Sequence, residues 1–103
     1  MALLSINEDN FEKSVMKGVS IVDFWAIWCG PCRLMSPIVE EIAKEMTDIN
    51  VYKLNVDDNP ELTAKFNIMS IPTIIIFKDG EEVEQTVGVV SKSVLVNKIK
   101  NYI

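Results

Sequence analysis

The sequence predicts an α/β fold, with a mixed five-stranded sheet covered by helices on both faces. Strand-like apolar runs alternate along the chain with segments whose apolar residues recur at helical spacing, in the order β-α-β-α-β-α-β-β-α. Such alternation places helices on both faces of a sheet that begins as a parallel one. Residues 78–81 carry a hairpin signal, so the sheet should end in an antiparallel pair. The 103 residues are enough for a single domain, residues 1–103.

The first two elements should be a short strand and a helix. A brief apolar run predicts the strand at residues 3–6. Residues 7–17 predict a helix whose inner face carries Phe11, Val15 and Met16.

The next two elements meet at the centre of the chain. Residues 19–25 predict a strand that is apolar on both faces, as expected where helices cover a sheet from each side. Residues 32–47 predict a helix, because their apolar residues recur at helical spacing. Pro37 lies inside this helix, where a proline costs about 3 kcal/mol. Since the apolar spacing continues beyond it, Pro37 predicts a kink and not an end.

The second half of the chain should begin with a strand at residues 51–56. Asn59 then predicts a helix cap, and Pro60 a first-turn proline, for a short helix that ends near Phe66. Methionines fill gaps in hydrophobic cores more often than they serve a function, and we expect that of three of them, Met35, Met46 and Met69.

The chain should end with a hairpin and a helix. Residues 73–77 and 82–87 predict the two strands of the hairpin. Ser91 predicts the cap of a final helix. The apolar residues that should face inward from this helix are Val94, Leu95 and Ile99.

Composition excludes several classes of function. The net charge of -5 disfavours binding to nucleic-acid backbones and to anionic membranes. No apolar run approaches the roughly 18 residues of a membrane helix, and the N-terminus lacks the basic region of a signal peptide. We therefore expect a cytoplasmic protein.

The chain has no histidine, which excludes Ser-His-Asp and Cys-His catalysis. Two cysteines alone cannot complete a zinc site, so we expect no metal.

The only two cysteines, Cys29 and Cys32, are the strongest indication of function. With two residues between them, they can form a disulfide that closes only a small ring. Such a ring is too small to stabilise a fold, but it can open and close without a change of fold. They follow a predicted strand and open a predicted helix, where free backbone N–H groups and the helix dipole lower a thiol's pKa. Arg33 adds a positive charge nearby. We therefore expect Cys29 to be exposed and nucleophilic, and Cys32 to be more buried with a higher pKa. The alternative is two inert buried cysteines.

The chain closely resembles the thioredoxin family. Six segments match in order and spacing and cover nearly the whole chain: VDFWA at 22–26, WCGPC at 28–32, KLNVD at 53–57, IPT at 71–73, FKDG at 77–80 and VG at 87–88. Ile27 is a departure, because relatives commonly have a polar or acidic residue or a proline there. The resemblance implies a thioredoxin fold and a monomeric protein-disulfide reductase. A separate thioredoxin reductase would recharge it, since no GxGxxG loop for a nicotinamide or flavin cofactor is present.

Asp23 and Lys53 are candidate catalytic residues on the predicted sheet. Asp23 interrupts an apolar strand, and burial there would raise its pKa toward neutrality. The resemblance implies that Asp23 helps to deprotonate Cys32, through water, and that Lys53 is its partner. The alternatives are a solvent-facing carboxylate at a strand end and a lysine that reaches solvent past apolar neighbours.

The resemblance also implies a docking surface around the cysteines. It implies a cis Ile71-Pro72 bond, whereas only about 5–6% of X–Pro bonds in folded proteins are cis. The Ile71 backbone would pair with a substrate chain as in strand addition. The substrate-binding residues would be Trp28, Gly30, Pro31, Ile71, Pro72 and Gly88, with Ser70, Val87 and Val89 beside them.

Three functional hypotheses follow. The first is a disulfide reductase, favoured over an oxidase or an isomerase because neither Gly30 nor Pro31 stabilises a thiolate further. The second is a binding module that uses the same surface without redox chemistry. The third is metal carriage, such as an iron–sulfur cluster shared by two chains, which the missing ligands disfavour.

Overall fold

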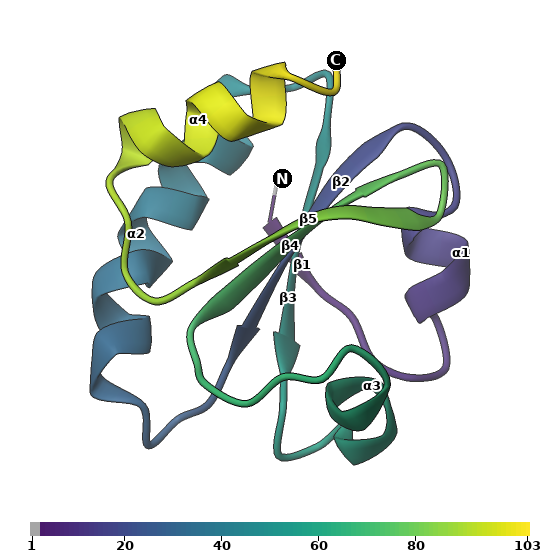
Figure 1. Cartoon of the computed structure of the whole chain (residues 1–103), viewed down its shortest axis with the longest axis vertical. Coiled ribbons are helices and arrows are strands. Elements are labelled where there is room, and N and C mark those ends of the chain that lie inside the picture. The colour runs from purple at the N-terminus through teal and green to yellow at the C-terminus, as the bar shows by residue number, and fades with distance from the viewer. Residues whose placement is uncertain (1–2) are drawn as a thin grey trace.

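The computed structural model describes residues 3–103, and its nine elements follow the predicted order (Figure 1). Their bounds are β1 Leu3–Ser5, α1 Phe11–Val15, β2 Val19–Trp25, α2 Gly30–Glu45, β3 Asn50–Asn55, α3 Pro60–Lys65, β4 Thr73–Lys78, β5 Glu81–Val87 and α4 Lys92–Lys100. No helix within residues 3–103 has the length and apolar character that crossing a bilayer requires.

The five strands form one mixed sheet in the order β1-β3-β2-β4-β5. Strand β3 pairs in parallel with β1 and β2, whereas β4 pairs antiparallel with β2 and β5. The α/β fold with a mixed five-stranded sheet is thus confirmed. The tight turn between β4 and β5 has positive φ at both central residues, 49° at Asp79 and 88° at Gly80, as two-residue hairpin loops prefer.

Helices cover both faces of this sheet, and each layer buries its own core (Figure 1). Successive residues of β2 point to opposite faces, so Ile21 joins one core while Val22 and Phe24 join the other. Helices α2 and α4 complete the first core with residues such as Met35 and Leu95. The second core contains a cluster of aromatic rings at centroid distances of 5.4–6.3 Å: Phe11, Phe24, Phe66 and Phe77. Strand β2 is therefore held rigidly from both sides.

Helix α1 is shorter than the predicted 7–17. The Asn7 side chain accepts hydrogen bonds from the backbone N–H groups of Asp9 and Asn10, and Asn10 Oδ1 accepts one from the Asn7 N–H. These local bonds give the backbone an alternative to the helix, which is why the segment before Phe11 forms a turn. The prediction for Met16 is wrong, because this residue follows the helix and is exposed.

Helix α2 begins at Gly30, two residues before its predicted start, and continues through Pro37 to Glu45. Pro37 does not end it, as the continuing apolar spacing predicts. The C-terminal helix α4 has the predicted cap, since Ser91 Oγ accepts a hydrogen bond from the Val94 N–H at 3.3 Å. Leu95 and Ile99 are fully buried, but Val94 is exposed, so its predicted inward position is wrong.

The cap of helix α3 comes from a segment that the sequence did not indicate. Asn59 makes no side-chain cap; its Oδ1 instead accepts the Glu8 backbone N–H at 2.9 Å. The Glu8 carboxylate accepts the backbone N–H groups of Glu61 at 2.8 Å and Leu62 at 3.4 Å. Glu8 is 53 residues from Glu61 in sequence, so only the tertiary fold brings this cap to the helix.

Glu8→Ala should destabilise the fold by about 1 kcal/mol, because it leaves the first N–H groups of α3 without their acceptor. Urea unfolding would measure the change. Asp9→Ala is the matched control, since Asp9 is an exposed neighbour whose carboxylate makes no hydrogen bond within the described chain. Equal losses in the two variants would show that Glu8 does not cap α3.

Candidate active site

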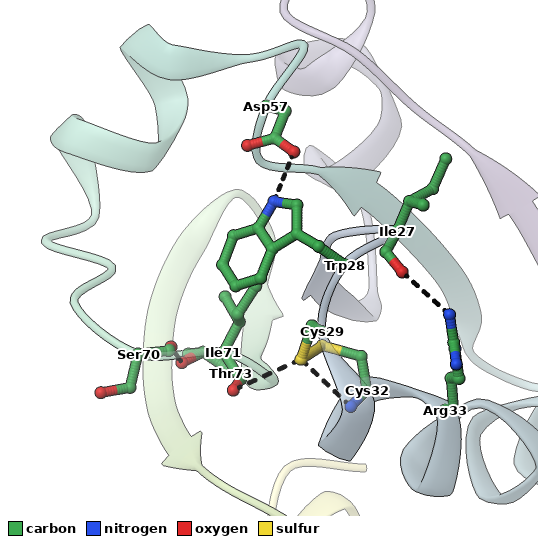
Figure 2. Close-up of a disulfide and its surroundings, with 9 residues drawn as sticks. All are labelled: Ile27, Trp28, Cys29, Cys32, Arg33, Asp57, Ser70, Ile71 and Thr73. Atoms are coloured by element: carbon green, nitrogen blue, oxygen red, sulfur yellow. Dashed lines mark hydrogen bonds between the residues drawn. A yellow bond between two sulfur atoms is a disulfide. The ribbon is translucent and has the colours of Figure 1, made fainter.

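Cys29 and Cys32 form a disulfide at the N-terminus of α2, with their Cα atoms 5.3 Å apart. Cys29 is the N-cap residue in extended conformation, and its Sγ accepts the Cys32 backbone N–H at 3.2 Å (Figure 2). The predicted position of the first sulfur, at free N–H groups on the positive end of a helix dipole, is confirmed. This environment stabilises a thiolate when the disulfide is open.

The predicted difference in exposure between the two cysteines is wrong for this oxidised form. Cys29 is 4% exposed and Cys32 is 5% exposed. Both pack against buried Ala26, with the partly buried Val56 and Ile71 beside them, and the closed ring holds the two sulfurs together. The asymmetry lies in what each cysteine faces: Cys29 lines a groove on one side of the disulfide, and Cys32 lines a cavity on the other.

The groove beside Cys29, called the front groove below, has a volume of about 510 Å³ and no charged lining residue. Its lining residues are Trp28, Cys29, Gly30, Pro31, Val56, Thr63, Ile68, Met69, Ser70 and Ile71. Trp28 is 68% exposed, and its indole Nε1 donates a hydrogen bond of 2.8 Å to Asp57 (Figure 2). This bond fixes the indole at the edge of the groove.

The Ile71-Pro72 bond is cis, as the family resemblance implied. The Ile71 carbonyl oxygen lies 3.7 Å from Cys29 Sγ, so the loop before β4 directly faces the disulfide (Figure 2). The Gly88 N–H donates to the Pro72 carbonyl at 2.8 Å, and Gly88 has φ +89°. Glycine adopts this left-handed conformation at little cost, so Gly88 joins the end of β5 to the loop beside the cysteines.

The cavity beside Cys32, called the back cavity below, has a volume of about 280 Å³ and contains Asp23. Asp23 is 5% exposed, so the alternative of a solvent-facing carboxylate is wrong. Burial raises the pKa of Asp23 from 3.8 to about 7, and the charge of Lys53 opposes that rise. Within residues 3–103, Asp23 Oδ1 has no hydrogen-bond partner. A carboxyl group with this pKa can exchange protons near neutrality.

Lys53 is paired with Asp23 across the parallel strands β2 and β3. Its Nζ lies 5.4 Å from the centre of the Trp25 ring, a cation–π arrangement. In the described part of the chain, Lys53 and Asp23 form no salt bridge. Lys53 therefore acts on Asp23 through its charge and not through a direct ion pair.

Comparisons with known proteins agree with this geometry. The sequence profile of the family named Thioredoxin matches residues 2–101. The chain belongs to the thioredoxin family. It is 45% identical to a thioredoxin of Staphylococcus saprophyticus, in an alignment of 104 positions that covers all of both chains. A thioredoxin of Staphylococcus haemolyticus is 48% identical over 89 residues, 85% of this chain and 86% of the relative.

A solved structure extends the similarity to the fold. A mutant thioredoxin from Halobacterium salinarum NRC-1 superposes with a TM-score of 0.92 at 34% identity, over 98% of this chain and 90% of that one. The thioredoxin fold is thus confirmed. Family membership, together with the cysteine pair at disulfide distance, makes this chain a thiol–disulfide oxidoreductase of the protein-disulfide reductase type.

Two residues of this site were not found by sequence reasoning. Asp57 lies in a matched segment, but nothing in the sequence pairs it with Trp28. Met69 was expected to fill the core, yet it is 92% exposed and lines the front groove. The adjacency of Met69 to the loop at Ile71 was the only available signal.

Asp23→Asn should stabilise the protein at pH 7 and above, with little effect near pH 4. The pKa of Asp23 is raised in the folded state, so the unfolded chain releases this proton first and wild-type stability falls as pH rises from about 4 to about 7. The rise of the pKa from 3.8 to about 7 corresponds to a gain of about 4 kcal/mol in the free energy of unfolding for Asp23→Asn at pH 7 and above. Urea unfolding of both proteins across this pH range would test it. A constant difference between them would contradict the raised pKa.

Proposed function

We propose that Cys29 is the nucleophile and Cys32 the resolving thiol in the reduction of disulfides in other proteins. The observation that carries this assignment is the position of Cys29 Sγ, which accepts the Cys32 N–H at the start of α2 and lines the front groove. Cys32 lies behind it, against the back cavity. A partner's disulfide approaching the groove therefore meets Cys29 first.

The proposed reaction moves two electrons from this chain to its target. The Cys29 thiolate attacks one sulfur of the target disulfide, which forms a mixed disulfide and releases the other target sulfur as a thiolate that takes up a proton. Cys32 then loses its proton and attacks Cys29 Sγ. The second target sulfur leaves, and the Cys29–Cys32 disulfide remains.

Asp23 is proposed as the acceptor of the Cys32 proton, with water in the back cavity as the carrier. The cavity is lined by both residues, and the pKa of Asp23, raised to about 7 by burial, suits transfer near neutral pH. Lys53 is proposed to adjust that pKa, since its positive charge favours the ionised carboxylate.

The proposed docking surface surrounds Cys29. A target chain would lie against Trp28, Gly30 and Pro31 on one side and pair with the Ile71 backbone on the other. Pro72 and Gly88 hold that backbone in place through the cis bond and the Gly88-to-Pro72 hydrogen bond. An uncharged groove suits targets of varied sequence, because no single charge is required of them.

The proposed partners are disulfide-containing proteins and a separate thioredoxin reductase that restores the dithiol. We place the chain in the cytoplasm, as a single-domain monomer, because a disulfide reductase works in a compartment where thiols are kept reduced. No cofactor of its own is needed for thiol–disulfide exchange.

Catalysed reduction of insulin by dithiothreitol tests the activity. The protein should accelerate precipitation of the insulin chains, and the double variant Cys29→Ser, Cys32→Ser should lose all of that acceleration while remaining folded. An activity that survives in the double variant would favour a binding module that uses the same surface without redox chemistry.

Trapping of mixed disulfides tests the separate roles of the cysteines. Cys32→Ser should accumulate covalent adducts with target proteins, because Cys29 still attacks and nothing releases the product. Cys29→Ser is the matched variant and should accumulate none. Adducts in equal amounts on non-reducing gels would contradict the assignment.

A further inference from the structure

The back cavity has the size of a small-ligand site and lies on the opposite side of the disulfide from the front groove. Figure 2 shows the two sides: Ile71 and Ser70 lie on one side of the cysteines, and Ile27 and Arg33 lie on the other. The cavity volume of about 280 Å³ is just below the roughly 300 Å³ at which sites for drug-sized ligands begin. Its occupant would therefore be a single small ring and not a peptide.

One end of this site is a buried hydrogen-bond acceptor. Asp23 lines the cavity and is 95% buried, and its Oδ1 has no partner among residues 3–103. A buried polar atom gains most from a partner that supplies the missing bond. The inner end therefore favours a ligand with an O–H or N–H donor.

The remaining walls combine apolar surface with two cations. Trp25, Ala26, Ile27 and Val39 line the cavity with apolar groups, which suit a planar ring. Arg33 is exposed, so its positive charge lies within reach of solvent, whereas Lys53 is half-buried beside Asp23. The Arg33 guanidinium is held there by a hydrogen bond from Nη2 to the Ile27 carbonyl at 3.4 Å (Figure 2). These cations disfavour a cationic ligand and favour an anionic group near solvent.

We propose that the back cavity binds a small aromatic acid that carries one anionic group and, at the opposite end of its ring, a hydrogen-bond donor. The donor would reach Asp23, the ring would lie against Trp25 and Val39, and the anion would face Arg33. A second anionic group would be excluded, because it would meet the Asp23 carboxylate.

Such a ligand would act on the resolving step of the proposed function. Cys32 lines the same cavity, so a bound acid displaces the water proposed to carry its proton to Asp23. This consequence rests on the proposed function, whereas binding itself does not.

Titration of the oxidised protein with 4-hydroxybenzoate, followed by heteronuclear NMR, tests the proposal. A ligand of about ten non-hydrogen atoms should bind with Kd near 1 mM, and its shifts should be confined to residues around the back cavity. Benzoate lacks the donor and phenol lacks the anion, so each should bind roughly tenfold more weakly, the loss of about one hydrogen bond to a charged group. Because the oxidised protein needs no turnover, a failure of insulin reduction would leave this test intact.

Variants separate this site from other binding. Ser36 is an exposed residue of α2 that lines the cavity, so Ser36→Phe should fill the space and abolish binding. Glu40→Phe is the matched control, an exposed position of the same helix outside the lining, and should bind normally. Arg33→Gln should weaken the binding of 4-hydroxybenzoate but not the binding of phenol, which has no anionic group. Three outcomes would each overturn the proposal. The first is a titration that does not saturate by about 10 mM 4-hydroxybenzoate. The others are NMR shifts at Trp28 and Ser70 in place of the back cavity, and unchanged binding by Ser36→Phe.

Discussion

The burial of strand β2 between two helical layers is the constraint on which the site depends. Ile21 and Phe24 anchor opposite faces of this strand in separate cores, so its C-terminal end cannot shift without disturbing both. Helix α2 starts a few residues beyond that end, and Cys29 caps it. The disulfide therefore lies at a rigid strand-to-helix junction. A site whose groups must keep one geometry gains from such support.

The other half of the site comes from distant segments that the sheet brings together. The cis Ile71-Pro72 bond precedes β4, and β4 pairs directly with β2, so the Ile71 carbonyl is carried to the disulfide. Gly88 follows β5 and donates its N–H to the Pro72 carbonyl of the same loop. Strand pairing thus places Ile71 at the front groove beside Cys29. The proposed docking surface is therefore preformed, which would lower the entropy that a partner chain loses on binding.

Asp23 shows a conflict between stability and chemistry within the core. An ionised carboxylate in a buried strand destabilises the fold, and the nearby charge of Lys53 offsets only part of that effect. Proteins commonly tolerate such strain where a titrating group is useful. The same residue lines the back cavity, which has room for water or a ligand that could hydrogen-bond to the buried carboxyl group.

Local patterns in the sequence were sufficient to predict the order of elements, the hairpin at Asp79-Gly80, the Ser91 cap and the position of Cys29 at a helix start. Each of these features depends on neighbours only a few residues away. The family resemblance added the cis bond at Pro72, which no local rule favours. The tertiary structure alone decided the Glu8 cap of α3, the Trp28-to-Asp57 hydrogen bond, the exposure of Met69 and the near-equal burial of the two cysteines. These features arise where segments distant in sequence meet, and hydrophobic periodicity reports which face of an element is buried but not which side chain lies opposite it.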